Sequence, residues 1–299
     1  MSRIVPGRLF LLAPCCCLIA LVLPTMTAAD GPKHSLQYKF AADSALHYTV
    51  GNESTIDVQV SDTQEEVQHS SEAGRLLRTV SLNSNGSANL EVMIEYVNLS
   101  AGNSAISWDS RSGEPPPAQF QGIEKTVGRP LMIITVASTG EVIAAESDGK
   151  MADKSQLEAA QFDLLPLLPA SPVAIGESWT EPFEVEVQTQ AKLPRTISLQ
   201  RLYTLRAIDN GIAEIDIRTN VLTPLQDPME EGQLIQRTPS GTLRFDIARG
   251  RMLERIMKLD NKVVGWQGPQ TTLHVVRTLQ ESLGSEEKAA ANAAGPVTK

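Results

Sequence analysis

Apolar and polar residues alternate with a period of two along most of the chain beyond residue 30. This spacing is typical of β-strands that bury one face. In the first half the alternating sets are Leu36, Tyr38 and Phe40; Leu46, Tyr48 and Val50; Ile56, Val58 and Val60; and Leu90, Val92, Ile94 and Tyr96. Residues 131–136 (LMIITV) are apolar on both faces, which predicts a more central strand. The turn at 138–140 and the strand at 141–143 complete a predicted hairpin.

The second half repeats the pattern. Its expected strands contain Phe183, Val185 and Val187; residues 199–206; residues 213–218; Leu243, Phe245 and Ile247; residues 252–259; and Leu273, Val275 and Leu279. Asp209-Asn210-Gly211 separates two of these strands and is typical of a hairpin turn.

Two short helices are predicted between the strands. Phe120, Ile123 and Val127 have helical spacing, and Gly128 follows as a C-cap. A second helix is expected to begin at Ser155, with Glu158 completing a capping box. Its apolar face is formed by Leu157, Ala160, Leu164 and Leu165, and Pro166 ends it.

The expected fold class is mainly β, with a few short helices on a curved antiparallel sheet or open barrel. Residues 133–143 and 243–253 both read as strand, glycine turn and strand, which suggests two related halves. We therefore expect a first half at 30–153 and a second half at 154–283, joined through the short helix and a proline-rich segment. Residues 284–299 are rich in alanine and charge, and are expected to form a disordered tail.

The first 29 residues have the pattern of a secretory signal peptide. Arg3 and Arg8 precede an apolar run at 9–23, and Thr27 to Ala29 supply small residues before Asp30. The run is shorter than the roughly 20 residues of a membrane span. We expect cleavage after Ala29 and export to the periplasm or the medium. A retained membrane anchor is the alternative.

Removal of this segment would change both the cysteine content and the charge. All three cysteines lie within it, at positions 15–17, so the mature chain would form no disulfide. The count of Lys plus Arg would fall by two, from 26 to 24, against 35 Asp plus Glu. The net charge would move from −9 to −11. A strongly acidic chain repels phosphate backbones, so nucleic acid is not an expected partner.

No motif in the chain predicts catalysis. Ser147 and Lys150 match the S-x-x-K spacing of serine acylases, but Asp148-Gly149 between them favours a turn over a helix. The histidines His34, His47, His69 and His274 are scattered, which disfavours a zinc site. Pairs such as Glu65-Glu66 and Glu230-Glu231 are read as solvated surface. We predict no catalytic residue, no cofactor and no metal.

Three Asn-x-Ser triplets fit the glycosylation pattern, at Asn52, Asn85 and Asn98, but polar turn residues are the preferred interpretation. Residues 162–179 contain Pro166, Pro169 and Pro172. We interpret this segment as structural, with Gly176 in a sharp turn and Trp179 anchoring the turn against the core.

Leu168 to Trp179, with the pattern L-P-x-x-P-V-x-x-G-E-S-W, resembles a motif in a family of uncharacterised exported bacterial proteins. Tyr38-Lys39-Phe40 and the segment from Phe245 to Gly250 are similar to further features of that family. The resemblance implies an architecture but no activity. The pattern of elements is also similar to periplasmic lipoprotein carriers, whose open curved sheet binds acyl chains, although fold analogy is weak evidence for function.

Three hypotheses for function follow. The first is an exported, non-enzymatic cell-envelope protein that binds a hydrophobic ligand, such as a lipid, on a curved sheet. The second is a structural module that binds another envelope protein through a strand edge. The third, and least favoured, is a hydrolase with paired carboxylates. Membrane contact is expected only through the signal peptide, and the partner is unknown.

Overall fold

The computed structural model describes residues 31–102, 105–147, 149–153, 156–157, 161 and 164–284. These residues form one 13-stranded antiparallel sheet that does not close into a barrel, which confirms the expected fold class. The predicted signal peptide and almost all of the predicted tail lie outside the described residues. No described helix is long and apolar enough to cross a membrane.

The strands of the first half form one side of the sheet. They are β1 (Ala45–Val60), β2 (Thr63–Leu82), β3 (Ala88–Ala101), β4 (Ile106–Asp109), β5 (Pro130–Val136), β6 (Val142–Ser147) and β7 (Lys150–Met151). From the edge inward the order is β7-β6-β5-β3-β2-β1, and β4 pairs with β3. Between β4 and β5 lie η1 (Ala118–Phe120) and α1 (Gln121–Glu124).

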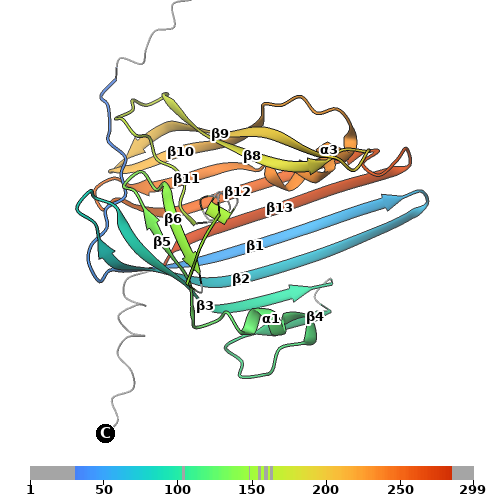
Figure 1. Cartoon of the computed structure of the whole chain (residues 1–299), viewed down its shortest axis with the longest axis horizontal. Helices are drawn as coiled ribbons and strands as arrows, with labels where there is room; N and C mark the ends of the chain where they lie inside the picture. Colours follow the sequence, from blue (N-terminus) through green and yellow to red (C-terminus); the bar gives the residue numbers. More distant parts are fainter. Residues whose placement is uncertain are drawn as a thin grey trace, which may run out of the picture.

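The strands of the second half continue the same sheet. They are β8 (Ser178–Gln188), β9 (Pro194–Asp209), β10 (Ile212–Val221), β11 (Ser240–Asp246), β12 (Arg251–Val264) and β13 (Thr271–Leu283). They follow one another in the order β13-β12-β11-β10-β9-β8, and β13 pairs with β1 (Figure 1). The two halves therefore join through the β1–β13 ladder, and β8 is a free edge. The hypothesis that they are repeats stays a prediction.

Turn chemistry fixes the hairpins of the second half. Asn210 and Gly211 both have positive φ, 49° and 81°, as a two-residue type I′ turn between β9 and β10 requires. Gly250, with φ 62°, ends the turn before β12. A Cβ there would approach the backbone nitrogen of Lys39 to 2.6 Å. Glycine at this position thus allows the segment before β1 to pack against the hairpin, where the Lys39 N–H donates to the Gly250 carbonyl.

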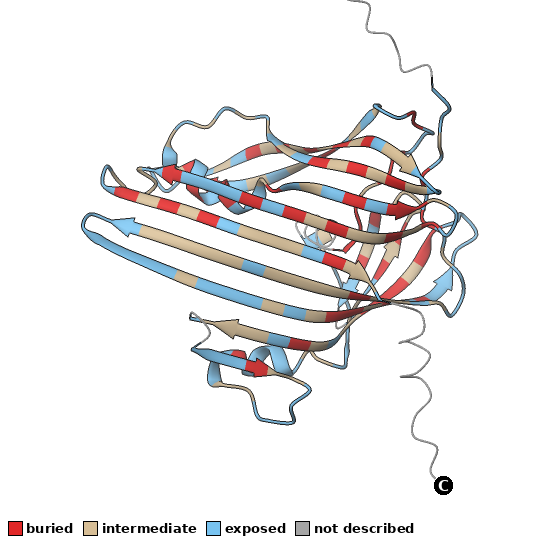
Figure 2. Cartoon of the chain, turned by 180° about the vertical axis from the view of Figure 1, so that it is seen from behind, coloured by how far each residue is buried: buried red, intermediate tan, exposed pale blue. Residues whose placement is uncertain are grey.

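One face of the sheet, termed the inner face, carries the core. Figure 2 shows buried and exposed residues alternating along the strands. The segment 164–173 covers one end of the inner face, where Leu164, Leu165 and Leu168 pack in the main cluster. The helical segment formed by α3 (Pro228–Leu234) and η2 (Ile235–Arg237) covers the other end. There Leu234 packs on β8 and β9, and Ile235 packs on β12 and β13.

Some strand predictions need correction. Residues 36–40 do not form a strand; they lie extended between two hairpin turns, with Leu36 and Tyr38 buried. The segments at 46–50 and 56–60 are one strand, β1. The strand at 131–136 is β5, but it lies near an edge of the sheet, and Ile133 is 41% exposed because it points away from the face that buries Ile134. The 20-residue β2 was not predicted, since its first half is polar on both faces.

The helix predictions are partly wrong. The first helix is only η1 followed by α1, and Val127 instead bridges Ile94. Ser155 and Glu158 lie outside the described residues. The reciprocal capping bonds join Asp153 and Gln156 instead, at 2.9 and 3.0 Å. Helix α3 was not predicted, although Asp227 followed by Pro228 and Glu230 has the cap, first-turn proline and acidic residue typical of a helix start.

Candidate functional site

A layer of charged side chains lies on the inner face between its two covers. Glu281 of β13 is 0% exposed and pairs across the ladder with Arg255 of β12. Its Oε2 accepts a hydrogen bond of 2.7 Å from Arg255 Nη2, and its Oε1 forms an ion pair with Arg75 of β2. Both arginines are also buried. One carboxylate therefore holds two guanidinium groups inside the molecule.

A second charged cluster lies toward the β8 edge. Glu181 accepts 2.5 Å hydrogen bonds from Arg201 Nη1 and from the Tyr203 hydroxyl. The Arg201 guanidinium lies 4.3 Å from the ring centroid of Phe183, and Trp179 stacks on Tyr203 with centroids 5.6 Å apart. These contacts fix the aromatic side chains of β8 against β9.

Burial keeps the tyrosines of this layer protonated to a higher pH than an exposed tyrosine, because it raises their pKa. Burial raises the pKa of Tyr48 to about 12, although Arg75, Arg251 and Arg255 lower it in part. Burial raises the pKa of Tyr203 further, and the negative charge of Glu181 adds to the increase. The hydroxyl of Tyr48 donates to the Met252 carbonyl at 3.1 Å. Tyr48 therefore acts as a neutral hydrogen-bond donor at ordinary pH.

Alkaline pH is expected to destabilise the fold through Tyr48. The unfolded chain loses this proton near pH 10, whereas the folded chain keeps it until about pH 12. The contribution of neutral Tyr48 to the free energy of unfolding is fully present below pH 10. It is lost as the pH rises toward 12, and the loss amounts to about 3 kcal/mol. Urea unfolding at stepped pH should show a shallower decline for Tyr48→Phe than for the wild type. Parallel curves would contradict the expectation.

Three hollows follow one another along the inner face. The largest of the three, a groove of 600 Å³, lies between β8, the β5–β6 hairpin and residues 157, 161 and 167–170. A void of 20 Å³ shares Gln161 with this groove. A cavity of 160 Å³ shares Arg255, Met257 and Leu279 with the void. The three hollows are thus neighbours on the inner face, from the β8 edge of the sheet to the charged layer.

The groove is mainly apolar. Its principal apolar residues are Val142, Leu157, Leu167, Leu168, Trp179 and Phe183. Trp179 is held in place by a 2.8 Å hydrogen bond from Nε1 to the Leu167 carbonyl. Glu181 and Gln161 supply polar groups. A mostly apolar hollow with a few fixed polar groups is typical of a small-molecule site.

The cavity lies under the α3–η2 cover. Gln236 of η2 and Pro239, two residues beyond η2, line it, together with Val50 of β1 and Arg277 of β13. Arg277 Nε donates to Asn52 Oδ1 at 2.6 Å. Among the described residues no carboxylate forms an ion pair with Arg277. Arg277 therefore has a neutral hydrogen-bond partner, Asn52, whereas Arg75 and Arg255 form ion pairs with Glu281.

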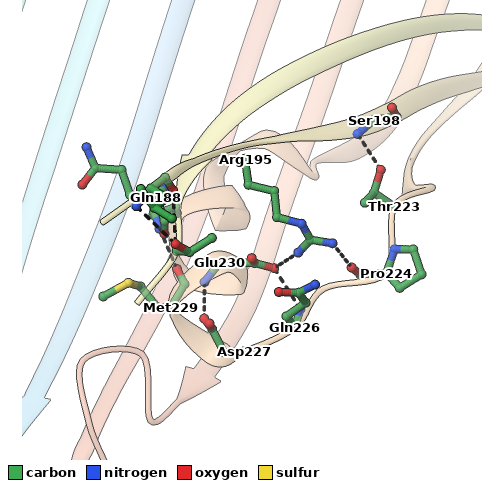
Figure 3. A network of polar contacts seen from close by, with 12 residues as sticks. Gln188, Arg195, Ser198, Thr223, Pro224, Gln226, Asp227, Met229 and Glu230 are labelled. Atoms are coloured by element: carbon green, nitrogen blue, oxygen red, sulfur yellow. Dashed lines mark hydrogen bonds and ion pairs between the residues drawn. The ribbon is translucent and has the colours of Figure 1, made fainter. Parts of the chain in front are cut away.

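A polar network fixes helix α3 against β8 and β9 (Figure 3). Glu230 is 0% exposed and forms a 2.5 Å ion pair with Arg195 Nη1, while Arg195 Nη2 donates to the Pro224 carbonyl at 2.9 Å. The Asp227 side chain caps the helix by accepting from the Glu230 N–H. Gln188 N donates to Gln233 Oε1, and Gln233 Nε2 donates to the Gln188 carbonyl. The cover over the cavity is therefore anchored at several points.

The structure corrects two interpretations of polar residues. Glu230 was expected on the solvated surface, but it is fully buried because it neutralises Arg195. Asn52 and Asn98 were expected in turns, but they lie within β1 and β3. Asn85 does lie in a turn, where its Oδ1 accepts from Ser87. The three triplets therefore do not share one structural role.

The other candidate residues are placed apart from the charged layer. Exposed His47 contacts Glu95 at 3.0 Å, and His274 contacts Asp260 at 2.8 Å. Ser147 ends β6 and donates to the Leu131 carbonyl, while Asp148 lies outside the described residues. Across the described part of the chain, no group of three or more His, Cys, Asp or Glu could hold a metal ion.

Of the residues around the site, sequence reasoning found only those of the proline-rich segment. The predicted anchoring role of Trp179 is confirmed, and Gly176 has φ 90° in the turn before it. The buried arginines were missed. A usable signal was present, because Arg201, Arg255 and Glu281 occupy the positions in their strands that the apolar residues occupy.

Comparisons with known proteins give limited information. A model of a protein family of unknown function, DUF6263, matches residues 150–250, which include β8, β9 and α3. No curated protein matches the chain. A solved structure, that of DynF from the dynemicin biosynthesis pathway of Micromonospora chersina, aligns with 6% identity over 87% of this chain and 90% of that chain, with a TM-score of 0.22. Over about one third of its length, residues 150–250, the chain is similar to a family without an assigned function.

Proposed function

We propose that this chain is an exported, non-enzymatic cell-envelope protein that binds a hydrophobic ligand on the inner face of its sheet. The observation that carries the proposal is the 600 Å³ groove, which opens beside the free edge of the sheet. Ligand sites in proteins commonly measure about 300–1,000 Å³ and are lined mainly by apolar and aromatic residues. The groove has both properties.

The ordered aromatic residues also support ligand binding. Trp179 and Phe183 line the groove, and each also contacts a side chain of β9. Trp179 stacks on Tyr203, and the Arg201 guanidinium lies over the ring of Phe183. A side chain fixed in this way loses little conformational freedom when a ligand packs on it. An apolar ligand would therefore gain from burial without a large ordering cost.

The charged residues favour binding over hydrolysis. A carboxylate hydrolase needs a pair of carboxyl groups that both face its substrate. Here Glu181 is engaged by Arg201 and Tyr203, and Glu281 is engaged by Arg75 and Arg255. Each of these two carboxylates has a structural partner, and Glu141, the second carboxylate that lines the groove, is exposed.

The free edge of β8 argues against the strand-addition alternative. Pro182 removes a backbone donor from this edge, and Glu184 and Glu186 are exposed along it. Proline and charge are the features by which edge strands avoid pairing with another chain. Addition of a partner strand is therefore disfavoured at β8, and the other edge of the sheet is β7.

Filling the groove should prevent binding. Ala170 lines the groove and is exposed, so Ala170→Trp adds bulk there without repacking the core. We expect the variant to bind a fluorescent fatty acid at least about tenfold more weakly, a loss of about 1.4 kcal/mol. Ala191→Trp, in the exposed turn after β8, is the matched control and should bind like the wild type. Equal binding by both variants would exclude the groove as the site.

Export is proposed from the signal pattern of residues 1–29. The intact mass of the protein recovered from the envelope and periplasmic fractions should correspond to a chain that begins at Asp30. A full-length mass would contradict cleavage and support a retained anchor.

A further inference from the structure

The 160 Å³ cavity beneath the α3–η2 cover combines positive charge with apolar walls. Three guanidinium groups line it, from Arg75, Arg255 and Arg277. Met257, Leu259 and Leu279 supply apolar surface beside them. Such a combination matches a ligand that has both a charged end and an apolar part.

The charged residues in the described lining of the cavity are all basic. Among the described residues that line it, three are arginines and none is acidic. The neighbouring Glu281 forms ion pairs with Arg75 and Arg255, whereas the half-buried Arg277 has a neutral partner, Asn52. Arg277 therefore provides a positive charge in the wall of the cavity that would attract an anion.

Arg277 is the group best placed to bind that anion. Its Nε donates to Asn52 Oδ1 of β1, and on the other neighbouring strand, β12, the residue paired with Arg277 is Leu259. A neutral amide orients the guanidinium but does not compensate its charge. The planar guanidinium binds carboxylates through two parallel N–H···O bonds, which makes it selective for that head group.

We propose that this cavity binds the carboxylate of a fatty acid, with Arg277 as its principal partner. The acyl chain would lie along Met257 and Leu279, the residues that the cavity shares with the 20 Å³ void leading toward the groove. The inference rests on the proposed function for the acyl chain and adds the chemistry of the head group.

The test compares two ligands that differ only in their head group. Dodecanoic acid and dodecanol are titrated into the full chain by calorimetry, for the wild type, Arg277→Gln, Arg277→Lys and Arg218→Gln. Arg218 lies in β10, is exposed, and serves as the matched control. The wild type should bind the acid about tenfold more tightly, because a hydrogen bond between two charged groups is stronger than one to a neutral hydroxyl. Arg277→Gln should lose this preference, Arg277→Lys should keep only part of it because an ammonium group cannot form the two parallel bonds, and Arg218→Gln should keep it in full.

The outcomes separate this inference from the proposed function. Equal affinity of the wild type for acid and alcohol would overturn the carboxylate site but leave hydrophobic binding intact. Binding of neither ligand would overturn both proposals. If Arg277→Gln still binds the acid more tightly than the alcohol, a residue other than Arg277 binds the carboxylate. The comparison within the wild type needs no variant, so it holds even if Arg277→Gln fails to fold.

A phosphate head group is the remaining anion with the same chemistry. Dodecyl phosphate, titrated in parallel with dodecanoic acid, shows which of the two head groups the cavity binds more tightly. The carboxylate assignment predicts tighter binding of dodecanoic acid, because the cavity of 160 Å³ favours the smaller head group. Tighter binding of the phosphate would overturn that assignment.

Discussion

Replacement of Glu281 by glutamine should lower the free energy of unfolding by about 4 kcal/mol, since removal of one partner from a buried ion pair commonly costs 3–5 kcal/mol. Glu281 is 0% exposed and is shared by Arg75 and Arg255, which are both buried. Glutamine preserves the shape of the side chain but removes the negative charge that the two guanidinium groups share. Urea unfolding followed by circular dichroism measures the loss.

Glu214→Gln is the matched control for this prediction. Glu214 forms an ion pair with Arg206 at the surface, where the two side chains are 36% and 54% exposed. Surface ion pairs contribute about 0–1 kcal/mol, so this variant should be almost as stable as the wild type. Equal stabilities for Glu281→Gln and Glu214→Gln would show that the buried charged layer does not support the fold.

Replacement of Glu230 by glutamine should release helix α3 from the sheet. Glu230 is fully buried against Arg195, and it also accepts from the backbone N–H of Gln226. We expect a loss of about 3 kcal/mol in the free energy of unfolding, at the lower end of the range for a broken buried pair because Arg195 is partly exposed. Hydrogen exchange in residues 228–237 should accelerate more than exchange in β12.

The neighbouring carboxylate provides the control for α3. Glu231 lies in the same first turn of the helix but is exposed. Glu231→Gln removes the same charge from the same end of the helix, so any general effect of the helix dipole appears in both variants. Identical exchange in Glu230→Gln and Glu231→Gln would contradict an anchoring role for the Arg195–Glu230 pair.

The sequence was most informative where one face of a strand is buried and turns are short. The hairpin around Asn210-Gly211 could be predicted because alternating residues flank a turn that requires positive φ. The strand β2 could not, because residues 63–72 extend beyond the covered part of the sheet and carry no apolar face. Hydrophobic alternation reports burial, so it fails where a strand is held only by its neighbours.

The site was less predictable than the fold. Trp179 could be recognised as an anchor from its size and its position after a proline-rich turn. Arg75, Arg255 and Glu281 lie more than 25 residues apart along the chain and meet only through the register of β1, β2, β12 and β13. No local pattern specifies such a meeting. Their placement at apolar strand positions indicated burial but gave no partner.

The central claim is that the inner face holds a hydrophobic ligand, and analysis of the protein isolated from its host tests it most directly. Organic extraction of the purified chain, followed by mass spectrometry, should recover a fatty acid or related acyl compound in an amount comparable to that of the protein. Ala170→Trp prepared in parallel should carry much less of it, and Ala191→Trp should carry the same amount as the wild type. Absence of any acyl compound from the wild type, together with no binding of an added fluorescent fatty acid, would contradict the account.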